Sequence, residues 1–96
     1  MEHTVTFLLK YPAGSSAEAE FLSAATNLAA IPGVGDFRIR RQVSPKNSHT
    51  FNISMDFDNR ADFQAYLDHP FHVEFVEKWW IPAVEDFREA DFVELQ

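Results

Sequence analysis

Apolar and polar side chains alternate without a break between positions 51 and 57. The alternating residues are, in order, Phe51, Asn52, Ile53, Ser54, Met55, Asp56 and Phe57. Successive side chains of a strand point to opposite faces, so this pattern predicts a strand with one apolar and one polar face. A chain of 96 residues has room for one domain and one core. The strand must therefore belong to a single sheet whose apolar face is covered by the same chain.

Three other segments are predicted to be strands of this sheet. In the first, Thr4 to Lys10, the residues His3, Val5, Phe7 and Leu9 share one face. The second runs from about 34 to 43, and its apolar residues alternate with charged ones. The last lies near residues 88 to 95 and has a mixed pattern.

Capping residues and prolines mark the helices between these strands. Ser15 stands three residues before Glu18, which is the spacing of a capping box, and this helix ends before Pro32. Asn59 is positioned to cap a short helix, and Pro70 suits the first turn of another. Pro82 is expected to kink or shorten that last helix.

The order β-α-β-β-α-(α)-β predicts an α+β domain over residues 2–95. Its expected architecture is a ferredoxin-like four-stranded antiparallel sheet with the helices on one face. The other face would then lie bare, and a second copy of the chain is the simplest cover for it. We therefore expect a homodimer in which this face turns toward the partner sheet. The residues expected on it are Thr4, Thr6, Asn52, Ser54 and Asp56.

Charge and composition exclude several classes of function. The 8 Lys and Arg against 15 Asp and Glu give a formal net charge of −7, which disfavours nucleic-acid binding. The chain has no Cys, so it has no disulfide framework, thiolate nucleophile or Cys-ligated metal site. No apolar run is long enough to cross a membrane, and no secretory signal opens the chain. We expect a cytoplasmic protein.

The remaining polar clusters are predicted to be structural. Arg38, Arg40 and Arg41 form the one basic cluster, and ion pairing at the polar face is favoured over anion binding. His69 is expected to cap the helix that begins at Pro70, and His49 to lie in a solvated loop. His69 and His72 stand three residues apart, but no third ligand supports a metal site, so none is expected.

Three polar side chains are predicted to point into one apolar space between the sheet and the helices. His3 belongs to the apolar face of its strand, Tyr66 shares a helix face with Phe63, and His72 shares one with Phe75. A buried imidazole stays neutral and can take a proton from a phenol or an enolisable carbon. The structural alternative is that these groups only satisfy one another in the core.

The segment Tyr66-Leu67-Asp68-His69-Pro70-Phe71-His72 has the pattern Y-x-x-H-P-x-H. With the strand and short helix before it, this pattern resembles the signature of the stress-responsive A/B barrel (Dabb) family. Other segments agree in the right order over essentially the whole chain. They are His3, Ile31-Pro32-Gly33-Val34, Ser44-Pro45-Lys46-Asn47 and Pro82-Ala83-Val84-Glu85-Asp86.

The resemblance implies a dimeric α+β barrel of two ferredoxin-like units, and it implies no single activity. The family includes stress-associated proteins and a polyketide-cyclase branch that uses neither cofactor nor metal. In that branch, the residues at the positions of Tyr66 and His72 are the acid and base. The residue at the position of His3 borders the same pocket. This chain differs from the branch at Asp68 and at the bulky pair Trp79-Trp80.

The leading hypothesis is a stress-associated protein that binds a small apolar molecule in a pocket and needs no cofactor. The alternative is a cofactor-free cyclase or isomerase that uses Tyr66 and His72. A cofactor-independent monooxygenase on a similar barrel is less favoured, because the H-P-x-H segment points to the stress-responsive family. The residues expected to bind the molecule are His3, Val5, Phe7, Phe21, Ile53, His69, Phe75 and Trp79.

Overall fold

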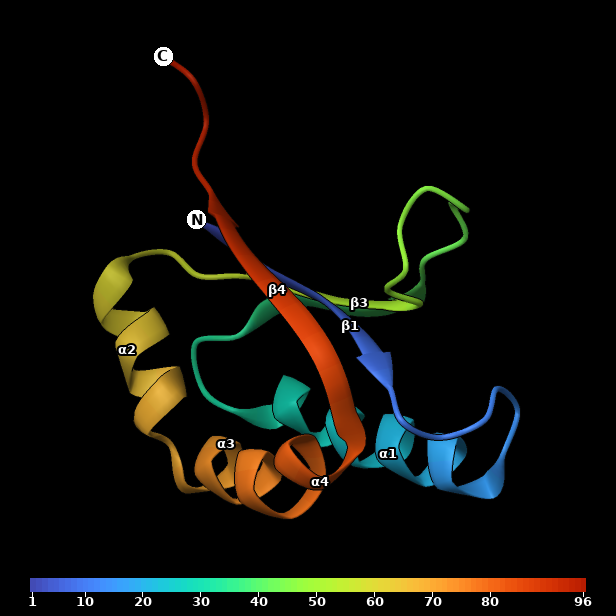
Figure 1. Ribbon diagram of the computed structural model, residues 1–96. Coiled ribbons are helices and arrows are strands. Elements are labelled where there is room, and N and C mark those ends of the chain that lie inside the picture. The colour runs from blue at the N-terminus through green and yellow to red at the C-terminus, as the bar shows by residue number, and fades with distance from the viewer.

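The computed structural model describes residues 1–96 and contains one four-stranded sheet with helices on one side (Figure 1). The strands are β1 (Glu2–Leu9), β2 (Gly35–Arg41), β3 (Phe51–Asp56) and β4 (Val84–Phe92). The helical elements are α1 (Ser16–Thr26), η1 (Asn27–Ala30), α2 (Arg60–Asp68), α3 (Pro70–Phe75), η2 (Val76–Trp80) and α4 (Ile81–Ala83). The sheet is antiparallel with the order β2-β3-β1-β4. The predicted ferredoxin-like α+β fold is confirmed.

Alternating burial along the central strands gives the sheet its two different faces. In β1 every second residue from His3 to Leu9 is buried, and these residues face the helices. Phe7 is the centre of the core, with 0% of its surface exposed and its ring packed against those of Phe21, Phe51 and Trp80. The apolar face of the sheet and the helix layer therefore share one aromatic core.

The predicted caps are present at three helix starts. The side chains of Ser15 and Asn59 accept hydrogen bonds from the backbone N–H groups of Glu18 and Asp62. The His69 ring accepts one from the N–H of Phe71 at the start of α3, so its predicted capping role is confirmed. None of the helices is long and apolar enough to span a bilayer.

The last helical region bends through a π-helical turn before it reaches Pro82. Residues Pro70–Phe75 are α-helical, Val76–Trp80 form the π turn, and Ile81–Ala83 complete the helix. A proline has no N–H and its ring crowds the carbonyl four residues earlier, and a wider turn relieves both effects. The helix ends one residue after Pro82, which agrees with the predicted shortening.

The predicted bounds of the last strand lie too far toward the C-terminus. Strand β4 begins at Val84, directly after the helix, and ends at Phe92 instead of running from 88 to 95. Phe92 pairs with Glu2 at the beginning of β1, so the residues after Phe92 have no strand left to pair with. They extend past the N-terminus in Figure 1.

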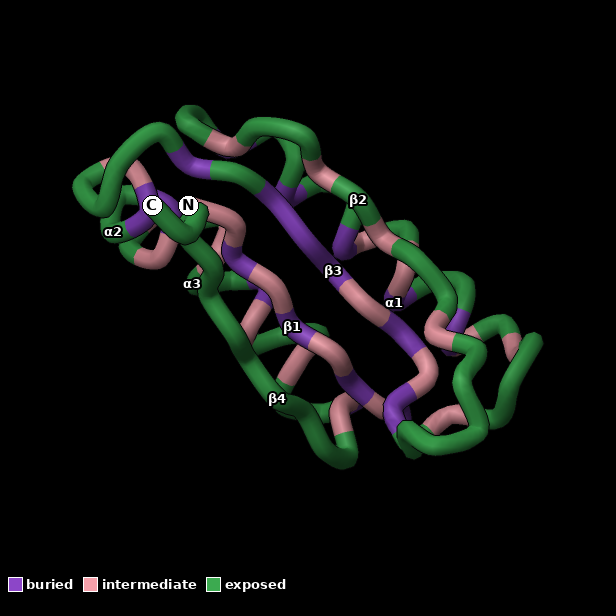
Figure 2. The backbone as a smooth tube through the Cα atoms, turned by 90° about the horizontal axis from the view of Figure 1, so that it is seen from above, coloured by how far each residue is buried: buried purple, intermediate pink, exposed green.

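The other face of the sheet is not covered by any helix, and Figure 2 looks directly onto it. Its residues are polar, as expected: Thr4 and Thr6 lie across from Ser54 and Asn52 on β3. The three arginines bond within the chain. Their partners are Asp36 for Arg38, Asn52 and Ser54 for Arg40, and Glu18 for Arg41.

Candidate functional site

A cavity of about 350 Å³ lies between the sheet and the helices. It is bounded by β1, β3 and β4 on one side and by η1, α2, α3, η2 and α4 on the other. Most of its walls are apolar. The lining residues are His3, Val5, Leu28, Ile53, Met55, Tyr66, Leu67, His72, Phe75, Val76, Trp80, Ile81, Phe87 and Glu89.

Tyr66 is held in this cavity by the aromatic residues around it. Its ring lies 5.3 Å from that of Phe57 and 6.4 Å from that of Phe63, and only 3% of the residue is exposed. No hydrogen bond within the chain involves the Tyr66 hydroxyl. Every fully buried polar side-chain atom of the chain does have a hydrogen-bond partner, so this hydroxyl is not fully buried. The hydroxyl is thus open to the cavity and free to bond a ligand.

Burial also determines the protonation state of Tyr66. Desolvation of the phenol raises its pKa far above the ordinary value, and the negative charge of Glu89 raises the pKa further. The side chain is therefore a neutral hydrogen-bond donor at physiological pH.

His72 is placed beside Tyr66 with one nitrogen already used. Its ring centroid is 4.7 Å from that of Tyr66, and its Nδ1 lies 3.1 Å from the carbonyl oxygen of Leu67. A carbonyl oxygen can only accept, so Nδ1 carries the hydrogen and Nε2 of the neutral ring holds a lone pair. The contact with the end of α2 thus fixes the tautomer that leaves Nε2 basic.

The pKa of His72 is lowered from its ordinary value of 6.5, chiefly because burial penalises the charged ring. The bond to Leu67 raises it, nearby His3 lowers it and Glu89 raises it, each by less than the burial effect. At neutral pH the imidazole is accordingly uncharged and able to accept a proton.

We predict a pH effect on stability from this shift. Below pH 6.5 the unfolded chain protonates His72 more readily than the folded chain, so the free energy of unfolding should fall as pH decreases from about 6.5 to the folded pKa. His72→Gln should flatten this slope, as measured by chemical denaturation between about pH 7.5 and pH 5. Equal slopes in both proteins would show that His72 titrates alike in the folded and unfolded states.

His3 enters the same cavity from β1 and is oriented by an aspartate. Its Nδ1 lies 2.6 Å from Oδ1 of Asp91, its cross-strand partner on β4. The carboxylate accepts, so Nδ1–H donates and Nε2 is the nitrogen that remains for other contacts. The His3 ring is 4.8 Å from Phe63 and 6.5 Å from Tyr66. Two imidazoles, each with its Nδ1 already bonded, thus flank one phenol.

The structure brings together six of the residues proposed for the site and separates four others from it. The six that line the cavity are His3, Val5, Ile53, Tyr66, His72 and Phe75. Phe7 and Phe21 do not line it, because Trp80 and Phe75 pack against their rings and occupy the wall instead. His69 faces the start of α3, where it serves as the cap.

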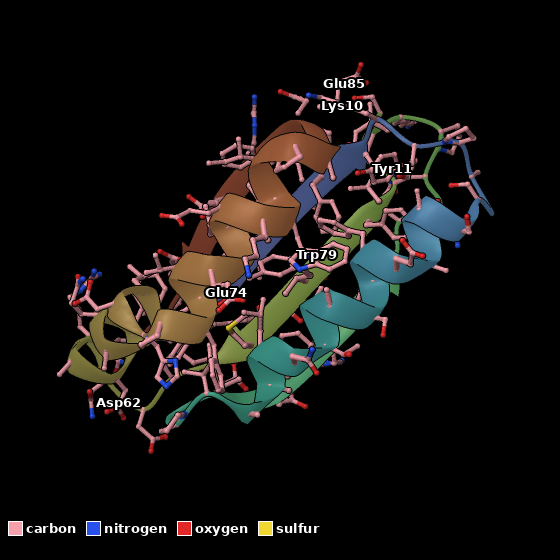
Figure 3. The ribbon with its side chains drawn as sticks, turned by 90° about the horizontal axis from the view of Figure 1, so that it is seen from below. Lys10, Tyr11, Asp62, Glu74, Trp79 and Glu85 are labelled. Atoms are coloured by element: carbon pink, nitrogen blue, oxygen red, sulfur yellow. The ribbon has the colours of Figure 1, made fainter.

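Trp79 is the fourth residue outside the cavity. It lines a separate surface groove. Figure 3 shows Trp79 between the helical segment of α3 and η2 and the helical segment of α1 and η1. The π turn changes the helical phase after Phe75, so Trp80 instead of Trp79 continues the inward-facing side. Leu28 and Phe75 line both hollows, and one layer of side chains separates the groove from the cavity.

Glu89 is the one acidic residue that lines the cavity, and the sequence analysis did not identify it. It pairs with Val5 across the β1–β4 ladder, two positions from Asp91, and so faces the helices. An acidic residue on an apolar-facing position breaks the usual alternation, and the weak pattern of β4 gave no signal of it. Only the register with β1 places Glu89 at the cavity.

His49 does not lie in a solvated loop, and that prediction was wrong. Only 7% of the residue is exposed, and both ring nitrogens are bonded. Nδ1 is 2.8 Å from the Thr6 hydroxyl and Nε2 is 2.6 Å from Asp86. The bond to His49 is the main reason why the pKa of Asp86 is lowered. This bridge ties the hairpin loop to β1 and β4 on the uncovered side of the sheet.

Comparisons with known proteins agree with this architecture. The family model for the stress responsive A/B barrel domain matches residues 1–94. A crystal structure of a Dabb family protein with a ferredoxin-like fold from Mesorhizobium loti is 46% identical, with a TM-score of 0.97 over 99% of this chain and 96% of that one. No functionally curated protein matches the chain.

More distant solved structures share the fold. A dimeric ferredoxin-like protein of unknown function from Thermobifida fusca is 23% identical, with a TM-score of 0.81 over 97% of this chain and 89% of that one. A hydroxynitrile lyase from Passiflora edulis is 19% identical, with a TM-score of 0.84 over 99% of this chain and 93% of that one. The match over nearly the whole chain, with the cavity and the Y-x-x-H-P-x-H segment that borders it, shows that this protein belongs to the stress-responsive A/B barrel family.

Proposed function

We propose that the cavity binds a small, mainly apolar carbonyl compound, that His72 transfers a proton to or from it, and that the Tyr66 hydroxyl donates a hydrogen bond to its carbonyl oxygen. The observation that carries this proposal is the pairing of a free phenol hydroxyl with a neutral imidazole, 4.7 Å apart between ring centroids, in an apolar cavity. A merely structural pair would be expected to bond within the chain, and the Tyr66 hydroxyl does not.

The chemistry that suits this pair is proton abstraction next to a carbonyl group. The Tyr66 hydroxyl donates a hydrogen bond to the carbonyl oxygen while Nε2 of His72 takes a proton from the adjacent carbon. The electron pair of the broken C–H bond moves into the enolate, whose oxygen the Tyr66 hydroxyl stabilises. Return of the proton to carbon or oxygen restores neutral His72. Alternatively the enolate carbon attacks a second carbonyl of the molecule, and the alkoxide that forms takes the proton from His72.

The second candidate function is binding without reaction. It requires the same cavity and the same apolar ligand, and His3, Tyr66 and His72 would then serve only as hydrogen-bonding groups. The fold is compatible with catalysis, since a hydroxynitrile lyase adopts it. The role in stress response and the cytoplasmic location expected from the sequence remain predictions for either function.

Binding is tested by nuclear magnetic resonance with para-methylacetophenone, a neutral ketone of suitable size. Titration should shift the signals of lining residues on both sides of the cavity, such as Val5, Ile53 and Val76. Enlarging the Val76 side chain in Val76→Phe should weaken binding by filling the cavity. Shifts confined to the separate groove around Trp79, or the absence of saturable shifts, would contradict the proposal.

We also propose that the chain forms a homodimer through the uncovered sheet face, in line with the dimeric neighbours. Sedimentation at micromolar concentration should show a species of twice the 11.0 kDa chain mass. Thr4→Lys places a charge on this face and should shift the equilibrium toward monomer, because a buried unpaired charge is costly. Ser23→Lys, on the exposed side of α1, should leave the dimer intact. A monodisperse wild-type monomer would contradict the prediction.

A further inference from the structure

One charged side chain, that of Glu89, lies where the cavity opens to solvent; we call this opening the mouth of the cavity. Glu89 lies on β4, the strand at the edge of the sheet, and is exposed on one side while it lines the cavity on the other. No Lys or Arg is among the fourteen lining residues. Glu89 therefore acts on a ligand without a competing positive charge in the wall.

The basic residues nearest in the chain are directed elsewhere. Arg88 is adjacent to Glu89 on β4, so its side chain projects from the opposite face of the sheet. Lys78 on η2 pairs with Glu74, at 2.9 Å between Nζ and Oε1. The acidic neighbour Asp91 is already bonded to His3. Glu89 itself has neither a salt bridge nor a side-chain hydrogen bond, so its carboxylate is free to accept one from a ligand.

Aromatic rings stand next to this carboxylate. Phe87 precedes Glu89 by two residues on the same face of β4 and is half exposed. Its ring meets that of Trp80 edge to face, with centroids 5.5 Å apart, and both residues line the cavity. Aromatic faces together with a carboxylate provide the two interactions that recognise an organic ammonium group, a cation–π contact and a charge-assisted hydrogen bond.

We propose that Glu89 is a specificity residue that selects ligands carrying a protonated amine beyond the carbonyl group, and that it rejects anionic ligands. The amine would lie at the mouth, between Glu89 and the rings of Phe87 and Trp80, while the apolar body fills the interior. This proposal rests on the proposed function, because it assumes that the cavity binds a carbonyl compound. It adds the charge class of that compound.

Three probes of similar shape and different charge test the proposal. They are para-methylacetophenone (neutral), para-(aminomethyl)acetophenone (positive at neutral pH) and para-acetylbenzoate (negative). The amine should bind about tenfold more tightly than the neutral ketone, and the carboxylate more weakly than either. Affinities are measured by calorimetry or by the same nuclear magnetic resonance titration.

The variant Glu89→Gln keeps the shape of the side chain and removes its charge. It should abolish the preference, so that the affinities of the variant for the amine and for the neutral ketone lie within about twofold of each other. Glu85→Gln is the matched control. Glu85 is another exposed glutamate of β4, lies outside the cavity and sits beside Lys10 at the end of the molecule (Figure 3). It should retain the preference of the wild-type protein.

A second measurement shows whether Glu89 faces the site, without any ligand. Its negative charge raises the pKa of His72, so Glu89→Gln should lower that pKa further and Glu85→Gln should leave it unchanged, as followed by the His72 ring signals. The role of Glu89 would be overturned if the wild-type protein bound the neutral ketone without preferring the amine, or if both variants lost that preference equally. Either result would leave the proposed function intact. Failure of all three probes to bind would overturn the proposed function and this inference with it.

Discussion

Tyr66→Phe is expected to lower the rate of proton exchange at the carbon beside a bound carbonyl by about 10²–10⁴-fold. The substitution removes the one hydroxyl that can stabilise the enolate oxygen and keeps the ring that packs against Phe57 and Phe63. His72→Gln should lower the rate by a similar factor, because it removes the basic Nε2. The measurement is loss of the ketone's α-proton signal in heavy water, with para-methylacetophenone as substrate.

The free energy of unfolding of each variant distinguishes a loss of catalysis from a loss of folded protein. The Tyr66 hydroxyl has no partner within the chain, so its removal should cost less than about 1 kcal/mol of unfolding free energy. Gln at position 72 can still donate a hydrogen bond to the Leu67 carbonyl. If both variants are folded and exchange the proton as fast as the wild-type protein, the catalytic proposal is contradicted and the cavity remains a binding site.

Phe7→Ala is expected to have the largest effect on stability, a loss of about 3–5 kcal/mol. Phe7 is fully buried, and its ring contacts those of Phe21, Phe51 and Trp80, so truncation leaves a hole between the sheet and two helical regions. Domains of this size are stable by about 5–15 kcal/mol in total, so the variant should be close to unfolding. Chemical denaturation at one fixed protein concentration measures the difference.

The matched control is Phe71→Ala on α3. Phe71 is 56% exposed, and its substitution should cost less than about 1 kcal/mol. A loss at Phe7 as small as that at Phe71 would mean that the core relaxes around the missing ring and that Phe7 is not its centre.

The sequence predicted the fold because its strand patterns and caps are local signals. The alternation over 51–57, the caps at Ser15 and Asn59 and the capping histidine at position 69 depend on near neighbours, and the structure contains each of them. Four strands and their connections then leave few possible arrangements. The order of the elements was therefore enough to predict the topology, and the alternation along the strands predicted which face of the sheet the helices cover.

The parts that could not be predicted depend on register and helical phase. Glu89 reaches the cavity only because β4 pairs with β1 in one register, and the pattern of β4 is too mixed to reveal it. Trp80 lines the cavity in place of Trp79 because of the π turn, which no local residue pattern indicates. His49 is buried by partners that lie 43 and 37 residues away in the chain. Such contacts form only when the whole sheet is assembled.

The most direct test of the proposed site is a crystal structure of the protein with para-methylacetophenone bound. The predicted result places the carbonyl oxygen within about 2.6–3.2 Å of the Tyr66 hydroxyl and the adjacent carbon about 3–3.5 Å from Nε2 of His72. The ring of the ketone should lie toward Phe75 and Trp80. A ketone seated in the groove at Trp79, or one in the cavity with its carbonyl turned away from Tyr66, would contradict the proposal.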